Sequence, residues 1–132
     1  TNLIEMTFLA DAQLLTQMIL NILLNAVQAI DVGGKINIQM IQNKLFPRFI
    51  QIIIADNGSG ISQKHIDSIF NPFFTTKSSG TGLGLTNAHN IVDAHRGTIE
   101  VISEEKKGTE VRVLLPTDIQ EKNKSFERKD TL

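Results

Sequence analysis

The chain contains no cysteine, tryptophan or tyrosine among its 132 residues, and it has only three prolines. Without cysteine there are neither disulfides nor thiolate zinc sites, which fits a reducing compartment. The 13 basic and 14 acidic residues give a net charge of −1, so there is no strong field for nucleic acid or an anionic membrane. The start has no secretory signal pattern and no Met, so we expect a piece cut from a longer protein.

The length is sufficient for one domain with a two-layer core. We expect this domain to span residues 1–116, and residues 117–132 to form a charged tail, as a solvated extension or a surface helix. The predicted order is strand, helix, strand, strand, helix, loop, helix, strand, strand. This order indicates an α/β two-layer sandwich, with a mixed, mainly antiparallel sheet and helices on one face.

Residues 12–30 are predicted to form a helix without any formal charge, capped by Asp11. Its amide side chains share one stripe, and most of the remaining surface is apolar, so we expect the helix to be covered on most sides. Asn21 and Asn25 lie one turn apart on the stripe and could offer oxygens to a cation and N–H groups to an anion. The alternative is a buried helix whose amides cap neighbouring backbone groups. Six amide and hydroxyl side chains argue against a membrane span.

The other elements follow from hydrophobic periodicity and turn residues. We expect the glycines that follow the first helix to end it, the strand after them to be half-buried, and the third strand to be covered on both faces. Ser62 is expected to cap a short helix that reaches Phe70. The predicted ranges are a strand at 3–10, strands at 35–42 and 49–55, a loop at 71–82, a helix at 83–95, and a hairpin of strands at 98–103 and 109–115.

Two glycine-rich segments are candidates for chemistry. Asp56 ends the most apolar strand and is followed by Gly58 and Gly60, so its carboxylate could accept a hydrogen bond from an exocyclic amine, or it could simply form an Asx turn. Residues 80–84 open a helix with alternating glycines, and their N–H groups could bind phosphate. Lys77 could add a charge to the same phosphates.

Other candidate residues are less specific. Phe70, Phe73 and Phe74 crowd into five residues, where they either anchor the loop to the core or form the latch of a lid. The three histidines lack metal-ligand spacing. No Ser/His/Asp set stands out.

Together and in this order, these segments resemble the catalytic, ATP-binding domain of sensor histidine kinases, in the wider family that includes DNA gyrase, a class of heat-shock chaperones and the mismatch-repair ATPases. Residues 20–30 (LNILLNAVQAI) resemble the N box of that family. DNGSGI resembles its first glycine box, FNPFFTTK its F box, GTGLGL its second glycine box, and Gly108-Thr109 its last. The wording FFTTK is similar to nitrogen-regulation and sporulation kinases.

The resemblance implies a Bergerat-type ATP-binding fold with ATP and Mg²⁺ as ligands. Asn25 would hold Mg²⁺ and Asn21 would line the phosphate side. Asp56 would accept from the adenine amine, Gly58 and Gly60 would admit the base, and Thr109 would close the adenine pocket. The β and γ phosphates would be held by Lys77 and by the segment Thr81, Gly82, Leu83 and Gly84, with residues 70–80 as the lid.

One departure bears on the reaction. The gyrase-like relatives keep a Glu near the start of the N box, whereas Asn21 lies there in this chain and residues 12–30 contain no carboxylate. This favours transfer of the γ-phosphoryl group to a protein side chain over hydrolysis. Many relatives also carry a charged residue where this chain has Gln28, so the resemblance assigns no phosphate contact to Gln28.

The resemblance further implies partners. The acceptor histidine of such kinases lies on a helical dimerisation domain N-terminal to this one, which then serves a response regulator. We expect dimerisation only through that domain, a cytoplasmic location, no nucleic acid and no direct membrane contact. The alternatives are a self-contained ATPase, a related protein-serine kinase that controls sigma factors, and a non-catalytic nucleotide-sensing module.

Overall fold

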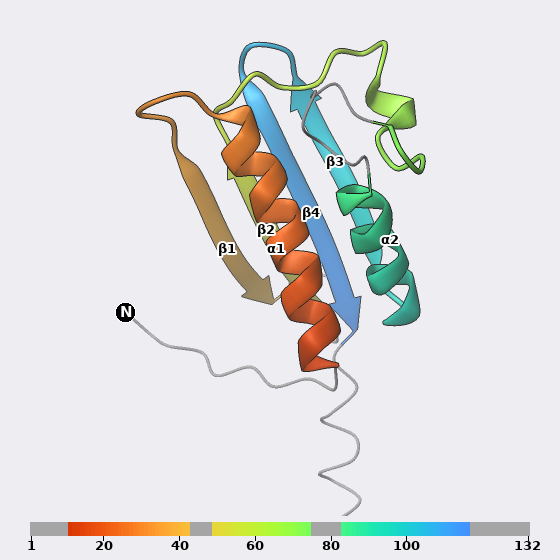
Figure 1. Ribbon diagram of the computed structural model, residues 1–132. Helices are drawn as coiled ribbons and strands as arrows, with labels where there is room; N and C mark the ends of the chain where they lie inside the picture. Colours follow the sequence, from red (N-terminus) through yellow and green to blue (C-terminus); the bar gives the residue numbers. More distant parts are fainter. Residues whose placement is uncertain (1–10, 43–48, 75–82, 117–132) are drawn as a thin grey trace, which may run out of the picture.

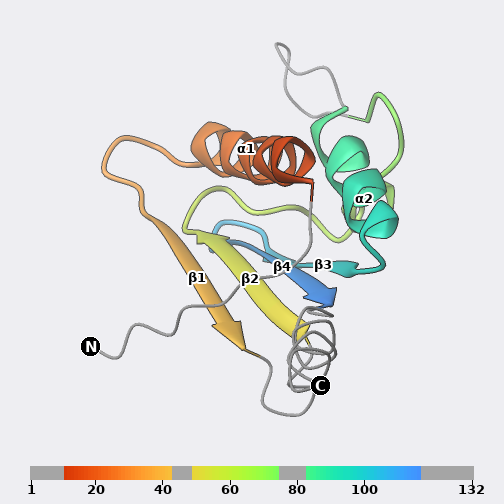
Figure 2. The same ribbon diagram turned by 90° about the horizontal axis from the view of Figure 1, so that it is seen from below.

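The computed structural model describes residues 11–42, 49–74 and 83–116. The elements are α1 (Ala12–Ala29), β1 (Ile36–Gln42), β2 (Phe49–Asp56), the 3-10 turn η1 (Ile66–Ser68), α2 (Gly84–Ala94), β3 (Thr98–Glu104) and β4 (Gly108–Pro116). Both helices lie on the same face of the sheet (Figures 1 and 2), so the predicted α/β two-layer fold is confirmed. The strand expected at 3–10, most of the expected loop and the tail lie outside the described residues.

The described strands form one sheet in the order β1-β2-β4-β3, and every pairing among them is antiparallel. The register places Asp56, the last residue of β2, opposite Thr109 of β4. Thr109 in turn lies opposite Ser103 of β3. Residues that directly face one another in an antiparallel sheet point to the same side. The sheet therefore gathers three polar side chains from three strands at one end, under the helices.

The core lies between this sheet and the two helices. Alternate residues of β2 are buried while those between them are only half-buried. The expectation that this strand is covered on both faces is therefore wrong, because both helices pack on the same face. Its central position is confirmed, since β1 and β4 pair with its two edges. The largest fully buried side chains of the core are Met18, Ile22, Ile50, Ile54, Val92, Val113 and Leu115.

Helix α1 starts as predicted and ends differently. The Asp11 carboxylate accepts hydrogen bonds from the N–H groups of Gln13 and Leu14, at 3.0 and 3.1 Å. At the other end the cap is Ile30, in an extended conformation. Gly33, with φ of 82°, belongs to the turn that follows. The glycines therefore turn the chain into β1 and do not cap the helix.

The expectation that α1 is covered on most sides is also wrong for the described part of the chain. Leu20, Leu24 and Val27 are 53%, 55% and 54% exposed. The next strand, β1, is one of the two edge strands of the described sheet. Its Ile38 and Met40 are 54% and 50% exposed, although they were expected on the buried face of a half-buried strand. Only one side of α1 packs on the sheet and on α2, which leaves these apolar side chains uncovered.

The short helix predicted to run from Ser62 to Phe70 is in fact the single 3-10 turn η1. His65 precedes this turn, and no side chain caps it. The Ser62 hydroxyl is buried and has no hydrogen-bond partner among the described residues. The apolar spacing that suggested a helix instead buries Ile69 in the core. The longer helix predicted at 83–95 is confirmed as α2, and the hairpin as β3 and β4.

Candidate functional site

A cavity of about 920 Å³ lies between α1, the N-terminus of α2, the loop after β2 and the start of β4. This volume is that of a typical site for a drug-sized ligand. Seven of the predicted site residues line it: Asn21, Asn25, Asp56, Gly60, Leu83, Gly84 and Thr109. Gly58 and Phe70 are described but do not line it, and Lys77, Thr81 and Gly82 lie outside the described residues.

One end of the cavity is formed by the strands of the sheet, and Asp56 lies at this sheet end. Its Oδ1 accepts a hydrogen bond from the Gly58 N–H at 2.9 Å. The Asx turn considered from the sequence is therefore present. The other carboxylate oxygen, Oδ2, takes no part in this turn. Because one oxygen shapes the turn and the second remains available, the structural and the ligand-binding interpretations of Asp56 are compatible.

Ser103 is a residue of this end that sequence reasoning missed. Its Oγ lies 2.8 Å from the Ile61 N, 3.0 Å from the Gly108 carbonyl oxygen and 2.7 Å from the Thr109 Oγ1. A carbonyl only accepts, so the single Ser103 proton is donated to Gly108, and the Ile61 N–H and the Thr109 hydroxyl donate to Ser103. Ser103 thus orients Thr109 and ties the loop after β2 to the sheet. The signal was a polar residue at an inward position of an alternating strand.

The two glycines after Asp56 fit the loop between α1 and the β3–β4 turn. A Cβ added to Gly58 would overlap the carbonyl oxygen of Ala29, and one added to Gly60, whose φ is +70°, would overlap that of Glu104. The Ser59 N–H donates to Ala29 at 3.0 Å. The structure therefore gives these glycines a packing role, and the admission of an adenine base by them stays a prediction.

The opposite end of the cavity is built from two helices. Gly84 opens α2 close to α1, since a Cβ added there would lie 3.8 Å from the Asn25 Nδ2 and 4.0 Å from the Asn21 Cβ. The Nδ2 group of Asn21 is buried and has no hydrogen-bond partner among the described residues. A buried N–H without an acceptor is costly, and a helix N-terminus favours negative charge. This end therefore suits an anionic oxygen, and Asn21 does not cap neighbouring backbone.

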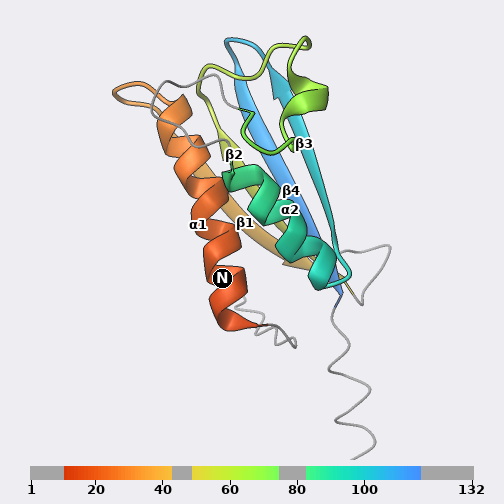
Figure 3. The ribbon, with the colours of Figure 1, turned by 45° about the vertical axis from the view of Figure 1, so that its right-hand side comes forward.

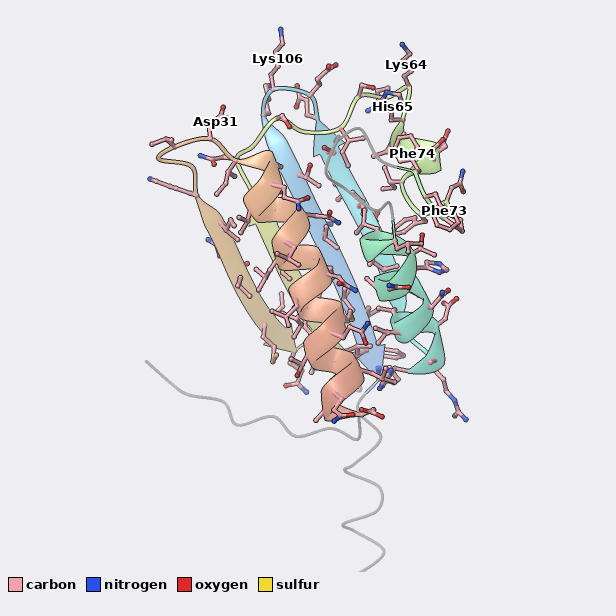
Figure 4. All side chains as sticks on the ribbon, viewed as in Figure 1. Asp31, Lys64, His65, Phe73, Phe74 and Lys106 are labelled. Atoms are coloured by element: carbon pink, nitrogen blue, oxygen red, sulfur yellow. The ribbon has the colours of Figure 1, made fainter. Side chains whose placement is uncertain are left out.

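Two of the three phenylalanines have the anchoring role considered for them, and the latch of a lid stays a prediction. Phe70 packs on His89 of α2 with ring centres 5.3 Å apart, and its carbonyl accepts from the Thr86 hydroxyl at 2.9 Å. Phe74 packs on His65, at 5.4 Å. Phe73 is 73% exposed and points away from the helices (Figure 4). Phe70 and Phe74 anchor this segment, whereas Phe73 makes no comparable contact in the described structure.

The described residues also bear on a metal site and on a membrane span. Within them, no group of three or more His, Asp or Glu side chains could hold a metal ion. None of the described helices combines the length and the apolar character that a membrane crossing requires.

Comparison with known families gives the class of this domain. Residues 10–119 match the family described as histidine kinase-, DNA gyrase B-, and HSP90-like ATPase. The chain belongs to this family. The matched range contains all of the described residues and the five motifs that resemble this family.

Similar proteins of known name are sensor kinases. The chain is 45% identical to the sensor histidine kinase ZraS of Escherichia coli over 114 residues, which is 86% of the chain and 24% of ZraS. It is 49% identical to AtoS, a signal transduction histidine-protein kinase of the same species, over 84% of the chain and 18% of AtoS. Sporulation kinase D of Bacillus subtilis is 40% identical over 86% of the chain and 23% of that kinase. The chain thus spans about a quarter or less of these relatives.

Solved structures place the fold among histidine kinases. The mycobacterial sensor histidine kinase MprB matches with a TM-score of 0.76 and 27% identity, over 83% of this chain and 76% of that one. The catalytic domain of the histidine kinase ThkA matches with a TM-score of 0.71 and 32% identity, over 82% and 69%. Full-length ShkA in complex with AMPPNP matches with a TM-score of 0.72 and 28% identity, over 84% and 23%. The fold is that of a histidine kinase catalytic domain.

Proposed function

We propose that this domain binds Mg-ATP and donates the γ-phosphoryl group to a histidine on a separate helical dimerisation domain of its parent kinase. The observation that carries the proposal is the Nδ2 of Asn21, which is buried without a partner among the described residues, on a residue that adjoins Gly84 at the start of α2 and lines the same cavity as Asp56. One end of this cavity suits anionic oxygens, and the other offers a carboxylate to an amine. ATP has both groups, separated by a ribose.

The roles of the lining residues follow from their positions. Asp56 Oδ2 accepts from the exocyclic amine of adenine, and Thr109, oriented by Ser103, closes the base pocket. Asn25 supplies a carboxamide oxygen to Mg²⁺, which prefers oxygen ligands and would neutralise charge on the phosphates. Asn21 and the backbone N–H groups of Leu83 and Gly84 bind phosphate oxygens. Lys77, Thr81 and Gly82 keep the phosphate-binding roles that the motifs imply.

Transfer to a protein side chain is favoured over hydrolysis by the placement of the carboxylates. Among the described residues that line the cavity, the acidic ones are Asp56 and Glu105. Both belong to the sheet end, in β2 and in the β3–β4 turn. In the described part of the chain, no cavity-lining carboxylate belongs to the helix end with Asn21 and Asn25, where a water-activating base would be needed. A self-contained ATPase is therefore the weaker alternative, and steady phosphate release by the isolated chain would support it.

The uncovered side of α1 supports a protein partner. Leu20 and Leu24 line a shallow hollow that also includes Asn21, and Asn21 and Leu24 line the cavity as well. An acceptor docked on this apolar surface would approach the phosphate end directly. We assign the surface to the helical domain that carries the histidine, through which the kinase also dimerises and serves a response regulator. The site of action is the cytoplasmic side, where ATP is found.

Calorimetric titration of the chain with ATP and GTP, each with and without Mg²⁺, tests the nucleotide part of the proposal. We expect binding that is selective for adenine and strengthened by Mg²⁺. Asn25→Ala should abolish the Mg²⁺ dependence, whereas Asn90→Ala, an exposed control on α2, should keep it. Equal affinity for ATP and GTP, or a Mg²⁺ effect that survives Asn25→Ala, would contradict the assigned roles.

The transfer step needs a second experiment. The chain alone should incorporate no phosphate from labelled ATP, and a purified dimerisation domain of the parent kinase added to it should become labelled on histidine. Acid lability of the label distinguishes phosphohistidine from phosphoserine, which the sigma-factor-kinase alternative predicts. Robust labelling of the isolated chain would contradict the proposal. Binding without any transfer would instead favour a nucleotide-sensing module.

A further inference from the structure

His95 joins the ends of the two helices that are farthest from the proposed phosphate site. It caps the C-terminus of α2, and its Nδ1 lies 2.8 Å from the carbonyl oxygen of Ile91 in the same helix. Its Nε2 lies 3.2 Å from the backbone N of Asp11, the residue that caps the N-terminus of α1. One half-buried imidazole thus bridges two helix termini that are 84 residues apart in the sequence.

The two backbone partners fix the protonation of the ring. The carbonyl of Ile91 can only accept, so Nδ1 carries the proton. The N–H of Asp11 can only donate, so Nε2 must be bare. The two assignments are independent, and they agree on one neutral tautomer. A ring with protons on both nitrogens could not accept the Asp11 N–H, so the bridge requires a hydrogen-bond acceptor at Nε2.

Local hydrogen bonds at both helix ends hold His95 and Asp11 in position. After His95 the chain turns through Arg96, whose φ is 58°. The Arg96 N–H donates to Asp93 at 3.0 Å and the Gly97 N–H to Val92 at 2.9 Å, which is the Schellman arrangement. On α1, the Asp11 carboxylate is occupied by two N–H groups of its own helix. The backbone N–H of Asp11 takes no part in that capping and donates to His95 Nε2.

The bridge lies at the opposite end of the helix pair from the phosphate site. α1 and α2 lie side by side and run in opposite directions (Figure 3). Gly84, at the start of α2, adjoins Asn25 near the end of α1, whereas His95, at the end of α2, adjoins Asp11. Along α1 the two contacts are about 20 Å apart at 1.5 Å per residue. The helix pair is thus tied at one end by His95 and open to a ligand at the other.

We propose that His95 is a positioning residue for nucleotide binding. Its neutral ring fixes the spacing and tilt of α2 against α1, so that the N-terminus of α2 and the carboxamides of Asn21 and Asn25 are held where one phosphate group can contact both. The proposal rests on the proposed function, since it assigns phosphate binding to this end. It concerns the phosphates alone, because Asp56, Ser103 and Thr109 belong to the sheet and do not depend on the spacing of the helices.

Three variants test the bridge. His95→Phe keeps a ring without an acceptor, His95→Asn can reach Ile91 but not Asp11, and His95→Gln places an amide oxygen near the position of Nε2. We expect Phe and Asn to weaken Mg-ATP binding by about three- to tenfold, the range of one hydrogen bond, and Gln to restore it. Adenosine, which lacks phosphates, should bind all four proteins equally. Asn90→Ala, at an exposed position on the same helix, is the matched control and should bind like the wild type.

The outcomes separate this inference from the proposed function. Wild-type protein that binds neither ligand would remove the proposed function and the inference with it. Normal ATP affinity in both the Phe and the Asn variants would overturn the inference and leave the function intact. Equal losses for ATP and adenosine would reduce His95 to a structural role. A Gln variant as weak as Phe would show that the acceptor at Nε2 is not what matters. A folding defect in one variant leaves the other to decide.

Discussion

The two ends of the cavity are built in different ways. At the sheet end, Asp56, Ser103 and Thr109 lie on three paired strands, and their side chains hydrogen-bond to the loop and to one another. At the helix end, Asn21, Asn25 and Gly84 come from two helices, and Asn21 Nδ2 lacks a partner among the described residues. The first end is held together by its own hydrogen bonds and still offers Asp56 to a ligand. The second leaves a buried donor unpaired among the described residues until a ligand binds.

This difference has a physical origin. Backbone hydrogen bonds fix the register of neighbouring strands, so side chains opposite one another cannot drift apart. The relative position of two helices depends on side-chain packing, which tolerates small shifts. An unpaired amide at the helix end lowers stability in the absence of ligand and adds affinity when an acceptor arrives. Variants at the two ends should therefore respond to nucleotide in opposite ways.

The largest effect should come from adding a side chain at Gly58, where the loop after β2 packs closely on the end of α1. In Gly58→Ala the new methyl group would overlap the carbonyl of Ala29, a backbone group that cannot rotate away. We expect the free energy of unfolding to fall by about 3 kcal/mol, at the upper end of overpacking effects. Urea denaturation measures it, with Gly33→Asn in the open turn after α1 as the control. Equal stability of Gly58→Ala and wild type would show that the loop moves freely from α1.

Asp56→Asn should separate the charge of this residue from its turn. The Asn oxygen can still accept from the Gly58 N–H, so the unfolding free energy should change little. Loss of a charge-assisted hydrogen bond of about 1.5 to 3 kcal/mol should weaken both ATP and adenosine by about 10- to 150-fold. Parallel titrations of the two ligands measure this. A variant that loses ATP but keeps adenosine would place Asp56 at the phosphate end instead.

Ser103→Ala should loosen the sheet end by a smaller amount. The part-buried N–H of Ile61 would lose its acceptor, and Thr109 its orientation. The cost of a buried donor left unpaired is about 1 to 3 kcal/mol, and partial exposure puts this case near the lower value. The midpoint temperature of thermal unfolding and the affinity for adenosine should both fall. Ser103→Thr, which keeps the hydroxyl, should retain both values. An Ala variant with unchanged adenosine binding would remove Ser103 from the base pocket.

The sequence was sufficient to predict which residues lie at the sheet end of the cavity, except for Ser103. Asp56 and Thr109 lie in segments with strong local signals, namely an apolar strand, glycines and alternation. For Ser103 the signal is a polar residue at an inward position of an alternating strand, and its role depends on the register between β3 and β4, which only the folded sheet defines. The short helix after Ser62 failed for a related reason. The segment buries Ile69 through successive tight turns, in which the His65 N–H donates to Ser62 and the Ser68 N–H to His65, and not through a continuous α-helix.

At the helix end, the pattern of α1 was predicted and its environment was not. Asn21, Asn25 and Gln28 of the amide stripe line the cavity, and Asp11 caps the helix, whereas Gln13 and Gln17 are exposed and line the hollow beside Leu20 and Leu24. The apolar residues Leu20, Leu24 and Val27 were expected to be covered, yet they are exposed in this domain. Hydrophobicity indicates that a side chain will be buried somewhere, but not whether the covering element lies in the same domain. The exposed surface is therefore itself the argument for a partner.

The smallest effect, and the sharpest comparison of the two ends, should come from Asn21→Leu. Leucine removes the buried unpaired amide and favours the helix, so without nucleotide the variant should be more stable than wild type by about 1 kcal/mol. With Mg-ATP at 100 times the dissociation constant, ligand binding should stabilise wild type by about 2.7 kcal/mol and the variant by much less. The order of stability should then reverse. Ser103→Ala should stay below wild type under both conditions, so thermal melts of these three proteins with and without Mg-ATP test the comparison directly. An Asn21→Leu protein that is less stable without nucleotide would mean that Asn21 is already paired in the free domain, and the contrast between the two ends would disappear.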